Sequence, residues 1–340
     1  MDFSDFKKNV PLAPYTTLKI GGSAEYLFIA TKQSELFDIL KFIHLHPELP
    51  YTILGRGSNV VISDLGLPGL TIINQASQIK VSPKITPATS FTATDTQRNE
   101  NEPSQYLDFS KIDYDESHLP TQSVTIQSGT PLPYAISQLI SLGLTGLQWF
   151  AYIPGTIGGA VYQNIHGGKY HFSDYLESIK VFNLKTGKTE IYKKSQLSWK
   201  YETSFFQTNP HLIILSATLR LFKGNTDLAK QVVRAWIEQK SKVQPINSPG
   251  SAFANPSLTD CQRVWGEQKS AGWIIDHELN LKGFSIGGAQ ISLQHSNFFI
   301  NTGSATATDY KKLVDHVQQQ VYDKFQIHLI PEVKFLGKFN

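Results

Sequence analysis

The sequence predicts a multidomain protein of the α/β or α+β class, and three observations support this. The chain has 340 residues, which suggests two or three domains at roughly 100–200 residues each. Hydrophobic residues make up 40% and charged residues 17% of the chain, as in proteins that form packed cores. Segments with helical spacing of apolar residues alternate with short runs rich in β-branched residues.

Residues 1–73 are predicted to form a first part with one helix and several short strands. Apolar side chains recur at helical spacing over 34–45, with Ser34 as the predicted N-cap and two prolines just beyond the end. Residues 51–54 and 60–62 are predicted as strands joined by a tight, glycine-rich turn.

Residues 83–120 are rich in Thr, Ser, Pro, Asn and acidic side chains. We interpret this segment as a surface insertion within a second part that spans residues 74–224. The alternative is a linker between domains. The alternating pattern of a strand resumes at 124–127 and favours the insertion.

The remaining elements follow from apolar periodicity and turn residues. The second part is predicted to hold a helix over 131–142, a hairpin of strands 179–183 and 189–192, and a strand over 212–221. A boundary near Gly224-Asn225 opens a third part, residues 225–340. Its predicted elements are helices over 227–240, 270–279 and 308–325, a glycine-rich strand region over 283–292 and a final strand over 330–335.

Composition excludes several classes of function. The net charge of +3 is too small to indicate a nucleic-acid partner. The single cysteine, Cys261, excludes a disulfide framework, and the ten histidines show no spacing typical of metal ligands. No stretch reaches the roughly 20 apolar residues of a membrane span, and the N-terminus lacks the pattern of a secretory signal. We therefore expect a cytoplasmic protein without metal, membrane or nucleic acid.

Two glycine-rich segments are the first candidates for chemistry. In Gly55-Arg56-Gly57-Ser58-Asn59 the glycines let backbone N–H groups approach an anion, and Arg56 and Ser58 add donors suited to a pyrophosphate. The segment Ile153-Pro154-Gly155-Thr156-Ile157-Gly158-Gly159-Ala160 has the same character. Taken alone, the first is more typical of a structural hairpin, whereas the second is more typical of a ligand site than of a structural turn. Together they favour a nucleotide site, although neither is a dinucleotide fingerprint.

Two single residues complete the candidates. Ser251 lies between turn-forming residues and can present its hydroxyl to a substrate, although a turn-capping role is the simpler interpretation. Glu332 lies in an apolar terminal segment, where an inward-facing carboxylate would have a perturbed proton affinity. The alternative for Glu332 is a solvent-facing position.

Taken in order, these motifs resemble one family over nearly the whole chain, the UDP-N-acetylenolpyruvoylglucosamine reductases, also called UDP-N-acetylmuramate dehydrogenases. The matching segments are 9–12, 16–24, 54–60, 153–160 with Asn164, 250–251 with 255–256, 270–275, 287–292 with His295 and Asn297, and 331–333.

The resemblance implies an α+β fold with a two-part FAD-binding region of the vanillyl-alcohol-oxidase/p-cresol-methylhydroxylase type and a C-terminal α+β substrate domain. It implies an oxidoreductase that uses FAD and NADPH to reduce the enolpyruvyl ether of UDP-N-acetylglucosamine to UDP-N-acetylmuramate. This step belongs to peptidoglycan synthesis, and hence to cell wall formation, cell shape and division. We expect a monomer.

The resemblance also implies roles for particular residues. Ser251 matches the family's proton-donating serine and Glu332 its catalytic glutamate. The residues that match flavin-contacting backbone are Gly21, Gly22, Gly55, Arg56, Gly57, Ser58, Asn59, Ile153, Pro154, Gly155, Thr156, Gly158, Gly159 and Ala160. Those expected to bind substrate are Tyr201, Asn255, Gln290, His295 and Asn297.

The chain departs from the family pattern at two cations. Glu202 stands at the arginine of the family's Tyr-Arg-x-Ser segment, and Ala254 stands at a lysine of Gly-Ser-x-Phe-Lys-Asn-Pro. Lys200 is a candidate substitute, since alternate side chains of a strand share a face. The departures leave open a flavin and sugar-nucleotide binding protein without turnover. A second alternative is an oxidase of the same fold with His166 as a flavin tether, although a surface-loop histidine is the simpler interpretation.

Overall fold

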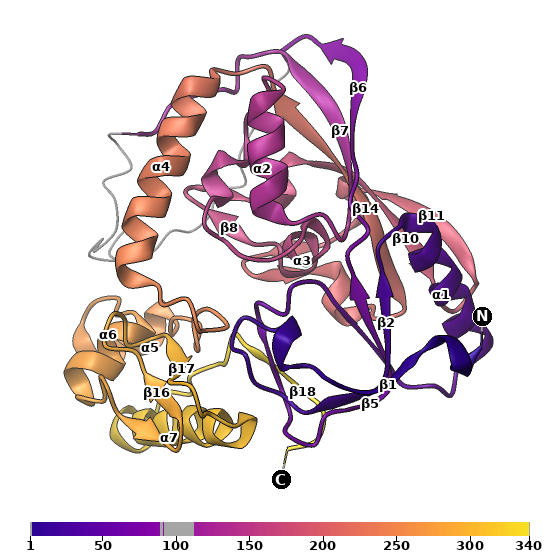
Figure 1. Ribbon diagram of the computed structural model, residues 1–340. Helices are drawn as coiled ribbons and strands as arrows, with labels where there is room; N and C mark the ends of the chain where they lie inside the picture. The colour runs from indigo at the N-terminus through magenta and orange to yellow at the C-terminus, as the bar shows by residue number, and fades with distance from the viewer. Residues whose placement is uncertain (1, 89–90, 92–111, 340) are drawn as a thin grey trace.

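The computed structural model describes residues 2–88, 91 and 112–339, and three parts follow one another along the chain (Figure 1). The first part is a four-stranded sheet with the order β1-β2-β5-β3. Its strands are β1 (Lys7–Pro11), β2 (Ser23–Ala30), β3 (Tyr51–Leu54) and β5 (Leu67–Asn74). β2 and β3 both pair in parallel with β5, and the helix α1 (Gln33–Leu45) makes the crossover that such pairing needs.

The predicted helix over 34–45 is confirmed, but Ser34 is not its N-cap. The helix begins at Gln33, and the capping residue is Lys32. The Glu35 carboxylate accepts hydrogen bonds from the backbone N–H groups of Thr31 and Lys32, at 2.8 and 3.2 Å. An acidic side chain in the first turn therefore binds the backbone donors just before the helix, and no serine side chain caps it.

The second part is a five-stranded antiparallel sheet with the order β11-β10-β14-β7-β6. Its strands are β6 (Ile79–Thr86), β7 (Thr121–Gln127), β10 (Leu176–Asn183), β11 (Lys188–Lys193) and β14 (Leu212–Phe222). The helices α2 (Leu132–Ser141), α3 (Ile157–Gln163) and α4 (Thr226–Val243) share one core with it. The predicted helices over 131–142 and 227–240, the hairpin and the strand over 212–221 are confirmed.

The segment interpreted as an insertion, 83–120, lies between β6 and β7, which are paired neighbours in this sheet. Residues 83–86 belong to β6, so the first four residues of the predicted insertion are strand. Residues 89–90 and 92–111 of the predicted insertion lie outside the described residues.

The helix α4, which we assigned to the third part, packs on the core of the second through Ala229, Val232 and Trp236. Figure 1 shows it reaching from the second part down to the third. The division at residue 225 stays a prediction, and this packing favours a boundary after α4.

The third part contains α5 (Leu258–Trp265), α6 (Ala271–Trp273), α7 (Ala307–Phe325) and a three-stranded antiparallel sheet. The strands are β15 (Ser285–Ile286), β16 (Ala289–Ile291) and β17 (Phe299–Asn301). α6 continues as a π-helical turn over Ile274–Glu278, so the predicted helix over 270–279 is confirmed. The helix over 308–325 is also confirmed, whereas the sequence analysis missed α5.

The chain then returns to the first part, where β18 (Lys334–Leu336) pairs in parallel with β4 (Val60–Ile62). Because β3 pairs with β5 instead, the turn between β3 and β4 joins two sheets and is not a hairpin. The predicted strand over 330–335 is wrong at its start, where Pro331 forms only an isolated bridge with Phe253. The smaller pairs are β8 (His166–Gly167) with β9 (Tyr170–His171) and β12 (Trp199–Lys200) with β13 (Thr203–Ser204).

Candidate active site

The structure brings the two glycine-rich segments into contact. Gly55–Asn59 connects β3 to β4, and residues 153–156 lead into α3. The Ser58 hydroxyl donates a hydrogen bond to the Pro154 carbonyl at 3.2 Å. A Cβ on Gly55 would lie 2.7 Å from the Thr156 hydroxyl oxygen, so any side chain there would push the loops apart.

Both loops keep backbone donors available for a ligand. The backbone N–H groups of Arg56, Gly57, Ser58 and Gly155 have no acceptor among the described residues. Gly57 has φ +58°, and a Cβ on it would lie 2.3 Å from the Tyr15 carbonyl oxygen, so only glycine fits. Clustered free N–H groups on a backbone without side chains suit the anionic and polar edges of a dinucleotide cofactor such as FAD.

The rest of the second loop is fixed by the start of α3. Thr156 caps the helix by accepting a hydrogen bond from the Gly159 N–H at 3.3 Å. A Cβ on Gly158 would lie 2.9 Å from Cβ of Ser128 at the end of β7, so this glycine allows the helix to approach the sheet. Gly21 and Gly22 pack in the same way on Ile62 and Asp64 at the end of β4. These glycines set the close packing that holds the loops in place.

Ser251 and Glu332 are brought together by backbone pairing in the third part. The Ala252 N–H donates to the Asn297 carbonyl at 2.7 Å, and the Glu332 N–H donates to the Ala252 carbonyl at 3.0 Å. The Asn297 side chain accepts from the Phe253 N–H and donates to its carbonyl, at 3.1 and 2.8 Å. Asn297, expected to bind substrate, thus holds the serine loop in position.

The same segment is tied to the first glycine loop. The Asn59 amide donates to the Glu332 carbonyl oxygen at 3.4 Å, and the Lys334 N–H donates to the Asn59 carbonyl at 3.0 Å. The pairing of β4 with β18 fixes this contact. Residues from the beginning, middle and end of the chain therefore form one site.

Glu332 is the most strongly perturbed acid of this site. Burial raises its pKa to about 8, the nearby Glu202 carboxylate adds to the rise, and Lys334 opposes it. A carboxyl with this pKa is mostly protonated at neutral pH and can donate a hydrogen bond or a proton. Glu332 is half-buried rather than exposed, which does not fit the interpretation as a fully solvent-facing side chain.

Glu202 contacts a histidine. Tyr201 and Glu202 form the turn between β12 and β13, with Glu202 at φ +49°. Its Oε1 lies 2.6 Å from Nδ1 of His166. Since the strand ends at Lys200, the expectation that Lys200 and Glu202 share a strand face is wrong. From the sequence, His166 was interpreted as a surface-loop histidine or, alternatively, a flavin tether. An acid at a position expected to be basic was the signal that could have revealed this pair.

Three residues expected to bind substrate make contacts within the third part. Oδ1 of Asn255 accepts from the Ala271 N–H at 3.0 Å, at the start of α6. Gln290 donates to the Gly283 carbonyl at 3.2 Å. Nδ1 of His295 accepts from the Asn297 N–H at 3.1 Å, and burial lowers the pKa of this histidine. Their roles toward a substrate stay predictions.

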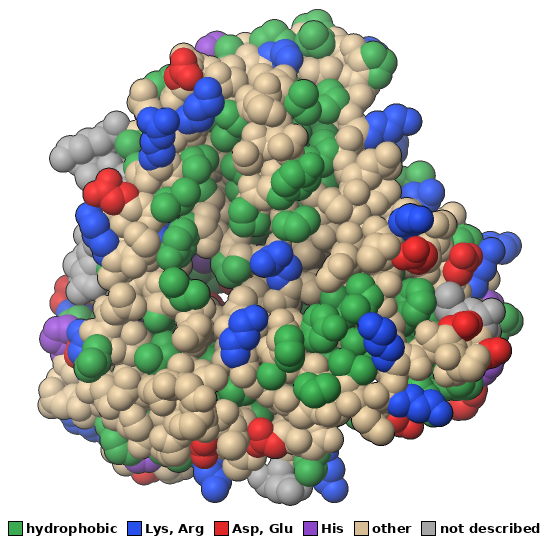
Figure 2. Space-filling model, viewed as in Figure 1, with side chains coloured by type: hydrophobic (Ala, Val, Ile, Leu, Met, Phe, Trp, Pro, Cys, Tyr) green, Lys and Arg blue, Asp and Glu red, His purple; other side chains and the backbone are tan. Residues whose placement is uncertain are grey.

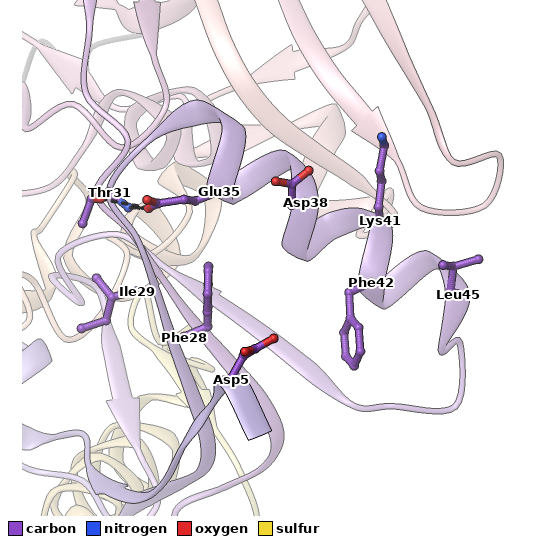
Figure 3. Close-up of a pocket in the computed structure, with 9 residues that line it drawn as sticks. All are labelled: Asp5, Phe28, Ile29, Thr31, Glu35, Asp38, Lys41, Phe42 and Leu45. Atoms are coloured by element: carbon purple, nitrogen blue, oxygen red, sulfur yellow. Dashed lines mark hydrogen bonds between the residues drawn. The ribbon is translucent and has the colours of Figure 1, made fainter. Parts of the chain in front are cut away.

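A separate cavity of about 810 Å³ lies between α1 and β2. It is lined by Asp5, Phe28, Ile29, Thr31, Glu35, Asp38, Lys41, Phe42 and Leu45 (Figure 3). None of the candidate site residues lines it.

In the described ranges, no group of three or more His, Cys, Asp and Glu side chains is placed to hold a metal ion. No helix within those ranges has both the length and the apolar character of a membrane span.

Comparison with known proteins identifies the family. A reductase from Acaryochloris marina is 32% identical over 97% of this chain and 92% of its own length, and one from Prochlorococcus marinus is 32% identical over 99% of this chain and all of its own. Both are UDP-N-acetylenolpyruvoylglucosamine reductases. This chain belongs to the UDP-N-acetylenolpyruvoylglucosamine reductase family.

Family models and a solved structure agree with this assignment. The C-terminal domain of this reductase matches residues 240–336, and an FAD binding domain matches residues 88–191. The crystal structure of the reductase from Thermus caldophilus matches with a TM-score of 0.69 at 27% identity, over 98% of this chain and all of that chain. The expected α+β flavoprotein fold is confirmed, and the chain is an oxidoreductase of peptidoglycan precursor synthesis that uses FAD and NADPH. These comparisons do not favour the alternative without turnover.

Proposed function

We propose that Ser251 and Glu332 perform the proton chemistry by which this chain reduces the enolpyruvyl ether of UDP-N-acetylglucosamine. The observation that carries the proposal is their joint position. A backbone hydrogen bond joins Glu332 to Ala252, the residue after Ser251, and Asn59 ties Glu332 to the glycine loop expected to hold the cofactor.

The free N–H groups of Gly55–Asn59 and of the loop before α3 would hold FAD. When bound, FAD supplies the hydride, received from NADPH, to the enolpyruvyl carbon. Figure 2 shows Lys and Arg side chains on the central surface of this view, where the three parts meet. Such side chains suit an approaching anionic sugar nucleotide.

Hydride addition leaves negative charge on the neighbouring carbon and on the attached carboxylate of the substrate. The Ser251 hydroxyl then donates the proton that forms the C–H bond. Glu332, protonated because it is buried, donates a hydrogen bond to the developing charge instead of repelling it. Water can reprotonate Ser251 before the next turnover.

We further propose the cellular setting that this reaction implies. The substrate is a soluble nucleotide sugar, so the enzyme acts in the cytoplasm. We also propose that it acts as a monomer. By supplying the precursor of the cell wall, it supports cell shape and cell division. Sedimentation of the purified protein tests the oligomeric state.

Anaerobic absorbance of the flavin tests the proposal in two steps. NADPH should bleach the wild-type protein, and the enolpyruvyl ether should then restore the yellow colour. In Ser251→Ala we expect bleaching within about twofold of wild type and a colour return slowed about 100-fold or more, because only the second step needs the proton. Equal losses in both steps would contradict the role of Ser251. No colour return in the wild type would overturn the proposed substrate.

A further inference from the structure

The contact between His166 and Glu202 has the geometry of a charge-assisted hydrogen bond. Nδ1 of His166 lies 2.6 Å from Oε1 of Glu202, slightly shorter than the usual distance between an N–H donor and a carboxylate oxygen. A carboxylate only accepts, so Nδ1 carries the hydrogen and Nε2 is the ring nitrogen left to meet another group. Glu202 thus fixes which edge of the imidazole faces outward.

The outward edge meets the phenol of Tyr201. Nε2 of His166 is hydrogen-bonded to the Tyr201 hydroxyl at 3.4 Å, and the two rings lie 4.8 Å apart between centroids. The side chain of His166 is 45% exposed, and Tyr201 is 53% exposed. A substrate can therefore reach the imidazole and the phenol together.

The hairpin that carries Glu202 is anchored to the helix that follows the second glycine loop. The Asn164 amide at the end of α3 donates to the Lys200 carbonyl at 2.8 Å, and the Ser204 hydroxyl donates to the Tyr162 carbonyl at 2.6 Å. Gln207 donates to the Glu202 carbonyl at 3.0 Å. The turn of Tyr201 and Glu202 is thus held in place by α3, whose first turn belongs to the expected cofactor loop.

The pair also acts electrostatically on the acid of the site. The Glu202 charge adds to the rise in the pKa of half-buried Glu332 that burial causes. His166 belongs to the β8–β9 ribbon, where its strand partner is His171, whose backbone N–H donates to the buried Asp174 at 2.9 Å. The pair therefore joins the β8–β9 ribbon to the β12–β13 turn.

We propose that His166, oriented by Glu202, replaces the missing arginine and binds the carboxylate of the enolpyruvyl group. To donate to that carboxylate, Nε2 must carry a proton, so the ring binds as an imidazolium with one N–H on Glu202 and one on the substrate. Glu202 is a positioning residue that acts through His166. This inference rests on the proposed substrate.

Equilibrium binding to the oxidised, FAD-loaded protein tests the inference without turnover. The two ligands are the enolpyruvyl ether of UDP-N-acetylglucosamine and UDP-N-acetylglucosamine itself, which lacks the carboxylate. In His166→Gln we expect the Kd of the ether to rise roughly 10- to 100-fold, as for loss of a hydrogen bond between charged groups. The Kd of UDP-N-acetylglucosamine should stay within about twofold. Equal changes for both ligands, or no change for either, would overturn the proposal.

Further variants separate charge from fold. Glu202→Gln keeps an acceptor for Nδ1 but loses the charge, so we expect a smaller rise in the Kd of the ether. The double variant His166→Gln with Glu202→Arg restores the family cation and should recover most of the affinity lost in His166→Gln. A double variant as weak as the single one would contradict a shared role.

His118→Gln is the matched control, because His118 pairs with Asp115 at 3.9 Å on an exposed surface. It should leave both Kd values unchanged, and flavin content checks that each variant folds. The same measurements distinguish a failure of the proposed function from a failure of the role of His166. If the wild-type protein binds UDP-N-acetylglucosamine but neither binds the ether more tightly nor is reoxidised by it, the substrate assignment fails. Normal turnover in His166→Gln overturns only the role of the histidine.

Discussion

The buried carboxyl of Glu332 should make the stability of this protein depend on pH in a way that one substitution removes. The backbone of Glu332 is fixed by pairing with Ala252, and burial raises the pKa of its side chain to about 8 from an ordinary value of 4.5. Glu332→Gln keeps the shape and a hydrogen-bond donor but cannot ionise. The variant therefore isolates the free-energy cost of the buried charge.

The magnitude follows from the two pKa values. They differ by about 3.5, which corresponds to roughly 5 kcal/mol. Below pH 4.5 the carboxyl is protonated in both the folded and the unfolded chain, so ionisation has no effect on stability. Between pH 4.5 and 8 the unfolded chain releases its proton while the folded protein keeps it, so the free energy of unfolding falls as pH rises. Above pH 8 the loss is complete.

Urea unfolding of both proteins at pH 5 and pH 9, with saturating FAD, measures the effect. We expect the stability of Glu332→Gln relative to wild type to increase by roughly 4 kcal/mol from the lower pH to the higher, because the unfolded chain has already lost most of its proton at pH 5. Glu202→Gln should reduce the pH dependence of the wild type, because the Glu202 charge contributes to the raised pKa. Glu48→Gln, at an exposed position, is the control. Parallel pH dependence of wild type and Glu332→Gln would refute the reasoning.

Two further substitutions test the loops and the contacts between the parts. Gly57→Ala should raise the Kd of FAD about tenfold or more and lower the free energy of unfolding by about 1–3 kcal/mol, because φ is +58° and its Cβ would lie 2.3 Å from the Tyr15 carbonyl oxygen. Gly266→Ala, with φ +74° and open space around it, controls for backbone strain alone, and equal effects on FAD binding would argue against a loop role. Asp64→Ala should lower the free energy of unfolding by about 1–2 kcal/mol, because its carboxylate accepts from the N–H groups of Ala307 and Thr308 at the start of α7, at 2.7 and 2.8 Å. Asp38→Ala, on an exposed face of α1, should change it by less than about 0.5 kcal/mol, and a similar loss there would remove the capping argument.

Local sequence patterns were sufficient for most helices. The apolar stripe over 308–325 predicts α7 to within one residue, because helical spacing acts between residues three and four positions apart. Periodicity did not identify the capping residue of α1, and it missed α5, whose eight residues make a helix too short for the pattern to repeat. It also extended the last strand into residues 330–333, which are mostly apolar but form only an isolated bridge, between Pro331 and Phe253, and no continuous strand ladder.

The motifs of the site were readable in order, but their contacts were not. Residue type was enough to single out Gly55–Asn59, Ser251 and Glu332. It did not show that the Asn297 side chain binds the backbone of Phe253. The sequence analysis placed Lys200 and Glu202 on one strand, whereas a turn begins at Tyr201. A turn of two residues redirects side chains, and alternation along a strand cannot reveal it.

The sequence by itself determined the family, the flavoprotein chemistry and the residue types of the site. These depend on short segments whose glycines, serine and acid are meaningful wherever the chain places them. Only the tertiary structure decided that Glu332 is half-buried and bonded to the residue after Ser251, and that Glu202 meets His166, 36 positions away along the chain. Such contacts arise from the pairing of β4 with β18 and from the bonds that anchor the β12–β13 hairpin to α3, and long-range pairing depends on packing across the whole molecule.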